Sequence, residues 1–453
     1  MKKEKNLTEG NLWKGIFLFS IPLIASNILQ VLFNISDIAV VGNFSTMKEK
    51  ALGSVGSTAI LVTLFTGFLI GIGSGVNVVI ANLVGRRDDK GERTAIFTSF
   101  FCSLIIGIIL LIIILIGARF FLILIDTKDG LLDGAVLYLR IYALGMPALA
   151  VYNFGNGTFS AIGNTKKPLL FLFIAGIVNV GLNLFFVIVC KLDVAGVAIA
   201  SIISQYISAI LIVISLTSLK NEHQLVFKGN KFNHIQAKQL LKLGVPSGFQ
   251  NCIFAIANLF IQKGVNSFDE LMVEGNSAAT NFDALVYDVM AAFYMACSSF
   301  IGQNYGAKKK KRIIQTYFIS MLYAFLAGAI IGICMYFFGS TMLRIFTQDA
   351  NVVKAGMRRM KVLGLSYMIS AAMDNSIAAS RGIGKSVIPT IIVICGSCLF
   401  RILWVYTIFA HYHTIESLYL LYSFSWTITG ACELTYFLVQ YKKLYKKGDM
   451  ALA

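Results

Sequence analysis

The sequence predicts an all-α polytopic membrane protein, with twelve transmembrane helices arranged as two pseudo-symmetric six-helix bundles. Its composition indicates a bilayer, because 57% of the 453 residues are hydrophobic, 13% are charged and the mean hydropathy is +0.76. The apolar runs are long and continuous, as in residues 102–116 and 169–189. Lipid offers no hydrogen-bond partners, so the spans must be helices or a closed barrel. A barrel would show shorter segments of alternating polarity, so helices are favoured.

Twelve segments of sufficient length follow one another along the chain, since each span needs roughly 20 mostly apolar residues. They fall near 12–41, 51–84, 94–125, 132–162, 168–190, 194–219, 238–266, 275–304, 313–338, 352–381, 387–410 and 415–441. A basic start followed by an apolar segment is typical of a secretory signal. That segment continues to about Val41 without a clear cleavage site, so we interpret it as the first retained span.

The formal net charge of +17 is compatible with nucleic-acid binding, but the positions of the charges argue against it. The basic residues cluster in short loops on alternate sides, and about two thirds of the Lys and Arg residues share one side. The positive-inside rule makes that side cytoplasmic. We therefore expect a multi-pass, monomeric protein of the cell membrane, with both termini in the cytoplasm and no nucleic-acid partner.

The two halves of the chain repeat. Corresponding pairs keep a steady offset, which shifts by three residues after a small deletion; they include Pro22 with Pro246, Asn27 with Asn251, Gly85 with Gly306, Asn153 with Asp374 and Pro168 with Pro389. Such weak, in-register identity is typical of transporter repeats. The prediction is an N-terminal lobe at 1–219, a cytoplasmic linker at 220–237 and a C-terminal lobe at 238–453, related by an axis along the membrane normal. A substrate cleft between the lobes would follow.

Asp37 is the most informative ionisable residue, because apolar residues flank it on both sides late in the first span. An ionisable group inside a span is expensive and usually faces a cavity. Loss of hydration would favour proton exchange at this carboxyl group. Alternatively, neighbouring oxygens would keep it ionised around a small hard cation such as Na⁺. A third interpretation is that Asp37 is simply a hydrated side chain at the outer end of the helix.

Asn179 and Asn183 lie four residues apart in the fifth span and therefore share one helix face. Two amides on such a face either join spans by hydrogen bonds or supply ligating oxygens. Together with Asp37 and Ser201, they would form a four-residue cation or proton site in the first half. The hypothesis includes Na⁺ held by Asp37, Asn179 and Asn183.

Further polar or adaptable residues inside spans are candidates for a substrate cavity: Asn34, Asn153, Tyr287, Asp288, Met295 and Asp374. Asp374 carries a charge where its repeat mate Asn153 carries an amide. Tyr287 and Met295 would line an adaptable apolar cavity, although most such residues face lipid. Arg401 is interpreted either as a counter-ion or as a group that extends to the interface.

Pro22 and Pro246 lie inside the first and seventh spans, at equivalent places in the two halves. Each removes a backbone donor and favours a kink, so we expect either gating helices or static kinks. No ATP-binding loop, zinc-protease motif or nucleophile elbow occurs. The sequence therefore predicts no enzyme and no cofactor other than a coupling ion.

The chain resembles the multidrug and toxic compound extrusion (MATE) family. The resemblance is carried by Ile21-Pro22, by Asn34 to Gly42 (NISDIAVVG), by Ile301 to Ala307 (IGQNYGA) and by Arg381 to Ser386 (RGIGKS). It implies an antiporter that extrudes organic, often cationic, drugs in exchange for H⁺ or Na⁺, with two six-helix lobes and alternating access.

The resemblance also implies residue roles. Asp37 occupies the family's coupling-critical aspartate motif, Asn179 and Asn183 its polar positions in the fifth span, and Ser201 its hydroxyl position in the sixth. Asp374 matches the acidic residue that some branches have before the R-G turn. The glutamate that those branches have in the seventh span has no counterpart between Leu240 and Val265.

Two other functions compete with drug export. A flippase of lipid-linked precursors would share the architecture but needs cationic groups for pyrophosphate, and within the spans mainly Arg140 and Arg401 are found. A passive channel or receptor-like scaffold is the third possibility. Internal duplication with asymmetric acids fits a carrier better.

Overall fold

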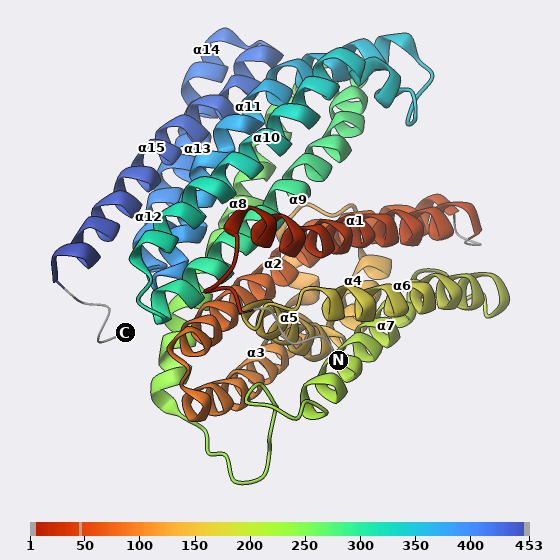
Figure 1. Ribbon diagram of the computed structural model, residues 1–453. Coiled ribbons are helices and arrows are strands. Elements are labelled where there is room, and N and C mark those ends of the chain that lie inside the picture. The colour runs from red at the N-terminus through yellow and green to blue at the C-terminus, as the bar shows by residue number, and fades with distance from the viewer. Residues whose placement is uncertain (1–5, 45–47, 448–453) are drawn as a thin grey trace. The chain divides into compact units, whose positions relative to one another are not determined.

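The computed structural model describes residues 6–44 and 48–447, and every regular element within them is helical (Figure 1). The helices of the first half are α1 (Leu12–Phe44), α2 (Lys48–Arg86), α3 (Asp89–Leu124), α4 (Asp129–Ala143), α5 (Met146–Ala161), α6 (Lys166–Leu184), η1 (Phe185–Val189) and α7 (Asp193–Thr217). Those of the second half are α8 (His234–Val265), α9 (Glu270–Gly306), α10 (Lys310–Leu343), α11 (Ala350–Gly382), α12 (Val387–Val393), η2 (Ile394–Leu399), α13 (Phe400–Trp404), η3 (Val405–Phe409), α14 (Ala410–Tyr412) and α15 (Ile415–Lys447).

These elements confirm the predicted all-helical fold, and each of the twelve predicted spans coincides with one helix or one run of adjoining helices. By length and composition, nine of the described helices qualify as membrane spans, and a tenth does if α4 and α5 count as one. The remaining two, α11 and α15, have 33 residues each but carry more polar and charged side chains. Both are long enough to cross a bilayer.

The fourth span differs from the prediction of one helix at 132–162. It consists of α4 and α5, which meet at an angle of 49°. The break falls at Leu144 and Gly145, and Pro147 stands in the first turn of α5. Proline suits the start of a helix because its missing N–H would have no partner there.

π-helical turns stand at the end of the fifth span and within the eleventh. η1 follows directly after α6, and η2 and η3 interrupt the α12 to α14 run. These two spans are repeat mates in the sequence, since Pro168 and Pro389 open them at equivalent places. Such turns occur frequently at functional sites.

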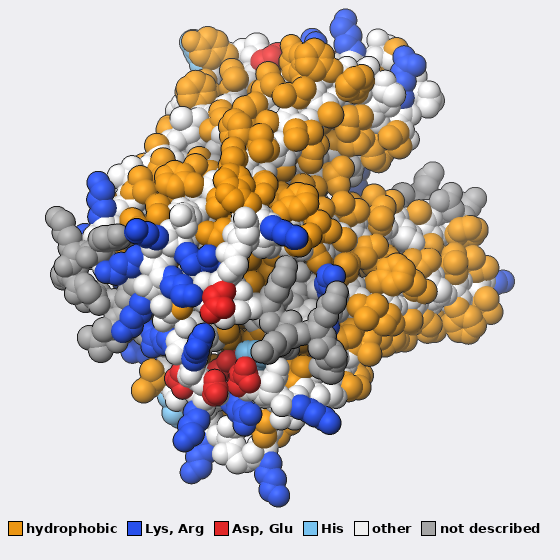
Figure 2. Space-filling view, viewed as in Figure 1, with side chains coloured by type: hydrophobic (Ala, Val, Ile, Leu, Met, Phe, Trp, Pro, Cys, Tyr) orange, Lys and Arg blue, Asp and Glu red, His pale blue; other side chains and the backbone are white. Residues whose placement is uncertain are grey.

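Hydrophobic side chains cover much of the visible helix surface, and Lys and Arg gather at helix ends (Figure 2). On α3, the exposed apolar residues include Ile105, Ile112 and Ile116, of which Ile116 is 79% exposed. A large apolar surface of this kind needs a partner that is not water. The helix lengths and this surface are those of a multi-pass membrane protein.

Two compact units make up the chain, and their boundary lies inside two helices. Unit 1 contains Ala25–Cys252, whereas unit 2 contains Leu7–Ile24 and the chain from Ile253 onward. Each of α1 and α8 therefore begins in one unit and ends in the other. The predicted lobe limits of 219 and 238 remain a prediction about the repeat.

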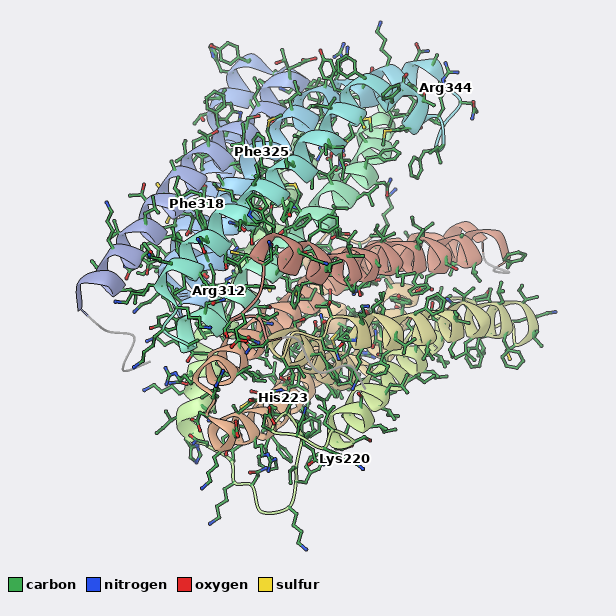
Figure 3. The ribbon with its side chains drawn as sticks, in the orientation of Figure 1. Lys220, His223, Arg312, Phe318, Phe325 and Arg344 are labelled. Atoms are coloured by element: carbon green, nitrogen blue, oxygen red, sulfur yellow. The ribbon has the colours of Figure 1, made fainter. Side chains whose placement is uncertain are left out.

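α8 begins at His234, so the last four residues of the predicted linker segment 220–237 are helical. The segment before α8 belongs to unit 1 and packs on α3. His223, labelled in Figure 3, is buried, and its Nδ1 contacts Glu92 Oε1 of α3. Leu225 is 1% exposed. Arg93 donates to the carbonyl oxygen of Asn221 at 3.3 Å. These contacts anchor the linker to the start of α3.

Candidate ion-coupling site

Unit 1 brings the four predicted coupling residues together. Asp37 of α1 accepts a hydrogen bond from Asn183 Nδ2 of α6 and another from Ser201 Oγ of α7, the latter at 3.4 Å. Asn183 Nδ2 also donates to Asn179 Oδ1 at 3.2 Å, one helical turn away. The predicted i, i+4 face of α6 therefore points at the carboxylate, and three helices converge on it.

A glycine on α6 determines how closely α1 approaches. A Cβ atom at Gly176 would lie 1.8 Å from Cζ of Phe33, so the Phe33 ring occupies the space that a side chain would fill. Phe33 precedes Asp37 by one turn, and Gly176 precedes Asn179 by three residues. The contact between the Phe33 ring and Gly176 therefore fixes the position along α6 at which the Asp37 carboxylate meets Asn179 and Asn183. Sequence reasoning missed this pair, and nothing local distinguishes it from ordinary helix packing.

Two tyrosines of α4 complete the surroundings of Asp37. The rings of Tyr138 and Tyr142 stack with centroids 5.9 Å apart, and both phenols interact electrostatically with Asp37. Tyr138 is 6% exposed. Neither was predicted, although their i, i+4 spacing on an apolar helix was a signal that could have been used.

The donor set suits a hard monovalent cation as well as a proton. Its residues carry a carboxylate, two amide oxygens and a hydroxyl oxygen, which are ligand types that hard cations prefer. In the structure it is Nδ2 of Asn183, and not its Oδ1, that contacts Asp37. Asn183 Oδ1 is buried without a hydrogen-bond partner, so one ligating oxygen is not otherwise used. Proton uptake requires only that Asp37 lose its charge while Ser201 and Asn183 keep their contacts.

Of the two predicted cavity residues in the first half, the structure describes the side chain of Asn153 but not that of Asn34. Asn153 is 9% exposed and its Nδ2 donates to the carbonyl oxygen of Leu149 at 2.9 Å. It packs on α2, where a Cβ atom at Gly73 would lie 2.8 Å from its carbonyl oxygen. Asn34 lies in α1, but its side chain is outside the part of the chain that the structure describes.

In unit 2, the predicted cavity residues stand on α9 and α11. Tyr287 is 47% exposed and interacts electrostatically with Asp374 and Asp288. Met295 is partly buried against the hydrophobic core of the unit. The structure thus groups Tyr287 with both acids, while Met295 stands two turns further along α9.

Other charged residues of unit 2 interact with Asp374 or with its partners. Asp374 interacts electrostatically with Arg381 of the same helix and with Arg401. Glu433 of α15 is fully buried and interacts with Arg381, and both its carboxylate oxygens lack a hydrogen-bond partner. Arg401 Nε also donates to Ser425 Oγ at 3.2 Å, and its interaction with Asp374 fits the counter-ion interpretation.

Asp283 has a structural role that its sequence context did not reveal. Arg359 Nε of α11 donates to Asp283 Oδ2 at 2.6 Å, and Arg359 Nη1 donates to Asn276 Oδ1 at 2.8 Å. Tyr419 of α15 donates to the same Asn276 oxygen at 3.0 Å. This network joins three helices in the interior of unit 2.

Both predicted gating prolines lie inside continuous helices. α1 passes through Pro22 and α8 through Pro246. Shortly after each proline the helix leaves one unit and enters the other. Near Pro246, a Cβ atom at Gly71 of α2 would lie 2.2 Å from the backbone nitrogen of Gly248, so the two helices touch at backbone level.

Comparison with known proteins decides the family. The MatE family model matches residues 22–185 and 246–407, which is one copy in each half. The chain belongs to the MatE family. A second model, described as lipid II flippase MurJ, matches residues 131–248 of this MatE-family chain.

Relatives of this MatE-family chain include transporters with different names. It is 28% identical over 370 residues to "Probable multidrug resistance protein YpnP" of Bacillus subtilis, with 81% of each chain covered. "Probable multidrug resistance protein NorM" of Thermotoga maritima is 22% identical over 391 residues, covering 84% of this chain and 82% of that one. "FAD transporter" of Shewanella oneidensis is 21% identical over 372 residues, with 78% of each covered.

Solved structures share the fold. An outward-facing multidrug resistance MATE family transporter of the MOP superfamily gives a TM-score of 0.90 at 20% identity, covering 99% of this chain and 100% of that chain. A MOP superfamily transporter from Pyrococcus furiosus, described as having a binding pocket of reversed polarity, gives 0.91 at 20% identity with the same coverage. The family and fold predictions are confirmed.

Proposed function

We propose that this MatE-family protein exports small amphipathic organic compounds, often cationic, in exchange for H⁺ or Na⁺. The observation that carries the proposal is the convergence of Asn183 and Ser201 on Asp37, from three helices of one unit. A carboxylate in this setting binds a cation or proton at a defined place. The multidrug resistance names of the relatives support the substrate class.

The mechanism we propose is competition between ion and drug. Binding of H⁺ or Na⁺ at Asp37 changes the charge to which Asn183 and Ser201 donate, and so changes the preferred position of α1. Because α1 continues through Pro22 into the other unit, that shift acts on both units. The ion-bound state then disfavours drug binding, and coupling of this kind is reciprocal.

We propose that in unit 2 the drug contacts the half-exposed Tyr287, its acidic neighbours Asp288 and Asp374, and Met295. For unit 1, Asn34 and Asn153 are kept as separate proposals for substrate contact. Acidic residues beside an aromatic ring suit a cationic amphiphile. Pro22 and Pro246 serve as the hinges. We further propose that both termini are cytoplasmic and that the monomer is sufficient for transport.

Reconstituted vesicles test this function. Purified protein in vesicles loaded with a fluorescent cationic drug should move the drug only when an H⁺ or a Na⁺ gradient is imposed, and the two gradients are applied separately. Asp37→Asn should abolish transport. Asp133→Asn is the matched control, because the Asp133 side chain is 85% exposed. Full transport by Asp37→Asn would reject the assignment, and so would drug-independent ion leakage, which indicates a channel.

The flippase alternative has one observation in its favour, the match of residues 131–248 to the MurJ model. That match covers one stretch of the chain, whereas the MatE model matches both halves. Unit 2 does hold two buried or partly buried arginines beyond those noted in the sequence, but Arg359 is paired with Asp283 and Arg381 with acids. Drug export therefore remains the proposal.

A further inference from the structure

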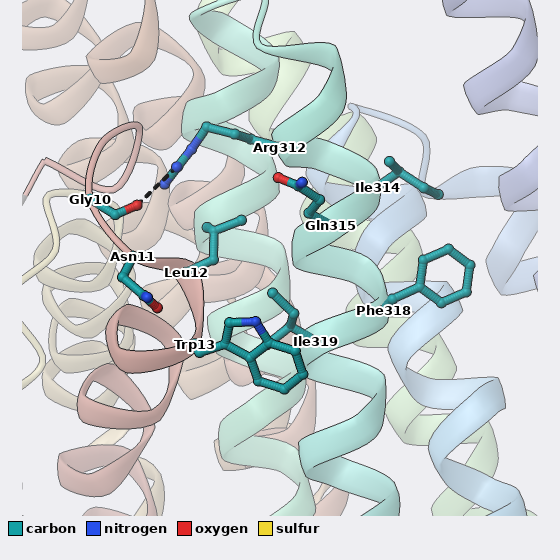
Figure 4. A pocket seen from close by; sticks show the side chains of 9 residues that line it. All are labelled: Gly10, Asn11, Leu12, Trp13, Arg312, Ile314, Gln315, Phe318 and Ile319. Carbon is teal, nitrogen blue, oxygen red and sulfur yellow. Dashed lines mark hydrogen bonds between the residues drawn. The ribbon is translucent and has the colours of Figure 1, made fainter.

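Unit 2 contains a groove that the transport mechanism does not use. It lies between the start of α1 and the first three turns of α10, and its volume is about 490 Å³. Trp13 forms one wall, and Gln315, Phe318 and Ile319 form the other, with Arg312 at one end (Figure 4). Both walls belong to the same unit.

The walls are held in place by hydrogen bonds, so the groove is preformed. Arg312 Nη1 donates to the carbonyl oxygen of Gly10 at 3.0 Å (Figure 4). Arg312 Nε donates to Asn304 Oδ1 at 3.1 Å. Tyr323 donates to the carbonyl oxygen of Trp13 at 3.3 Å, and the two rings meet edge to face at 5.7 Å. A preformed site loses little entropy when a ligand enters.

The end of the groove at Arg312 is strongly basic. Residues 308–312 are four lysines and an arginine, and Glu9 is the acid that interacts with Arg312. The carbonyl and amide partners of Arg312 satisfy its N–H groups without neutralising its charge. Lys311 is exposed and precedes the groove residues Gln315 and Phe318 by four and seven residues, so it stands on the same helix face.

The groove changes from charged to apolar along α10. Six residues separate Arg312 from Phe318, a rise of about 9 Å. Trp13 and Phe318 are 47% and 50% exposed and present apolar rings. Tryptophan is enriched at the headgroup level of membranes, and basic pockets between helices at the cytoplasmic side bind anionic headgroups. A ligand that fits has a phosphate at one end and a hydrocarbon chain at the other.

We propose that this groove binds one anionic phospholipid of the cytoplasmic leaflet. Its phosphate lies beside Lys311 and Arg312, and an acyl chain runs along Trp13 and Phe318. The lipid bridges the first turns of α1 to α10. It therefore stabilises the part of α1 that belongs to unit 2.

Native mass spectrometry of the full-length protein in neutral detergent tests the proposal. Titration with phosphatidylglycerol should leave one retained lipid per chain, and phosphatidylcholine should bind more weakly. Lys311→Gln should weaken the binding of phosphatidylglycerol about fivefold, because one nearby charge is lost. Gln315→Trp should weaken it at least as much by filling the groove without changing the charge.

The control is Lys354→Gln, an equal loss of charge at an exposed lysine in the first turns of α11. Equal weakening by Lys354→Gln and Lys311→Gln would show diffuse attraction and overturn the proposal. Thermal stabilisation by inorganic phosphate equal to that by phosphatidylglycerol would also overturn it, because the site would then be a simple anion site. If Gln315→Trp fails to fold, the Lys311 comparison still decides, since Gln is a good helix former.

Discussion

The buried ion pair in unit 2 gives a sharp prediction about what holds the helices α9 and α11 together. Arg359 and Asp283 have side chains 7% and 9% exposed, and 2.6 Å separates their charged atoms. Arg359→Met keeps a long aliphatic side chain but removes the partner of Asp283 and the donor to Asn276. An uncompensated buried charge costs about 3–5 kcal/mol.

That cost corresponds to about two to four powers of ten in the unfolding equilibrium. The double variant Asp283→Asn with Arg359→Met removes the unpaired charge and should recover most of the loss. Replacing both members of a buried pair is often close to neutral. The prediction is therefore strong non-additivity, with the double variant more stable than the single Arg359→Met variant.

Unfolding of the purified protein by a denaturing detergent, followed by circular dichroism, measures these free energies. Arg358→Met is the matched control, because Arg358 and Glu416 are 3.7 Å apart with side chains about half exposed. A surface pair contributes about 0–1 kcal/mol. The reasoning is refuted if Arg358→Met costs as much as Arg359→Met, or if the double variant is no more stable than the single.

Two further predictions concern close helix contacts in unit 1. Gly176→Val should displace the Phe33 ring, cost about 1–3 kcal/mol by overpacking and weaken ion binding at Asp37, as measured by calorimetric ion titration. Gly71→Ala should lower both the thermal unfolding temperature and the transport rate. The added Cβ would clash with the backbone of Gly248, which cannot move away as a flexible side chain could.

Both predictions have controls on the same helices. A Cβ atom added at Gly181 of α6 or at Gly56 of α2 meets no atom within 4 Å. Gly181→Val and Gly56→Ala should therefore leave ion affinity and thermal stability close to those of the parent protein. Equal losses in test and control variants would mean that helix propensity, and not the close contact, explains the effect.

Hydropathy and spacing were sufficient to predict most of the fold. Long apolar runs fix where helices cross lipid, so the twelve spans were found, and the i, i+4 spacing of Asn179 and Asn183 indicated a shared face. The four residues of the candidate coupling site do meet in the structure. Their role in transport remains a prediction.

What the sequence did not reveal depends on contacts between distant segments. The pairing of Asp283 with Arg359 joins α9 to α11, and that of His223 with Glu92 joins the linker to α3. No local pattern encodes such pairs. The division of α1 between two units is likewise a packing result that a repeat in the sequence does not contain.

Drug affinity measured as a function of ion concentration tests most directly whether an ion and a drug compete through Asp37. In Asp37→Asn the new amide oxygen still accepts the hydrogen bond from Asn183, and the new amide NH2 group donates to Ser201 Oγ. The geometry is therefore largely preserved while the charge is lost. Fluorescence titration of a cationic drug should show affinity that falls as H⁺ or Na⁺ rises in the parent protein. The same titration should show constant affinity in Asp37→Asn, and an unchanged ion dependence in that variant would contradict the account.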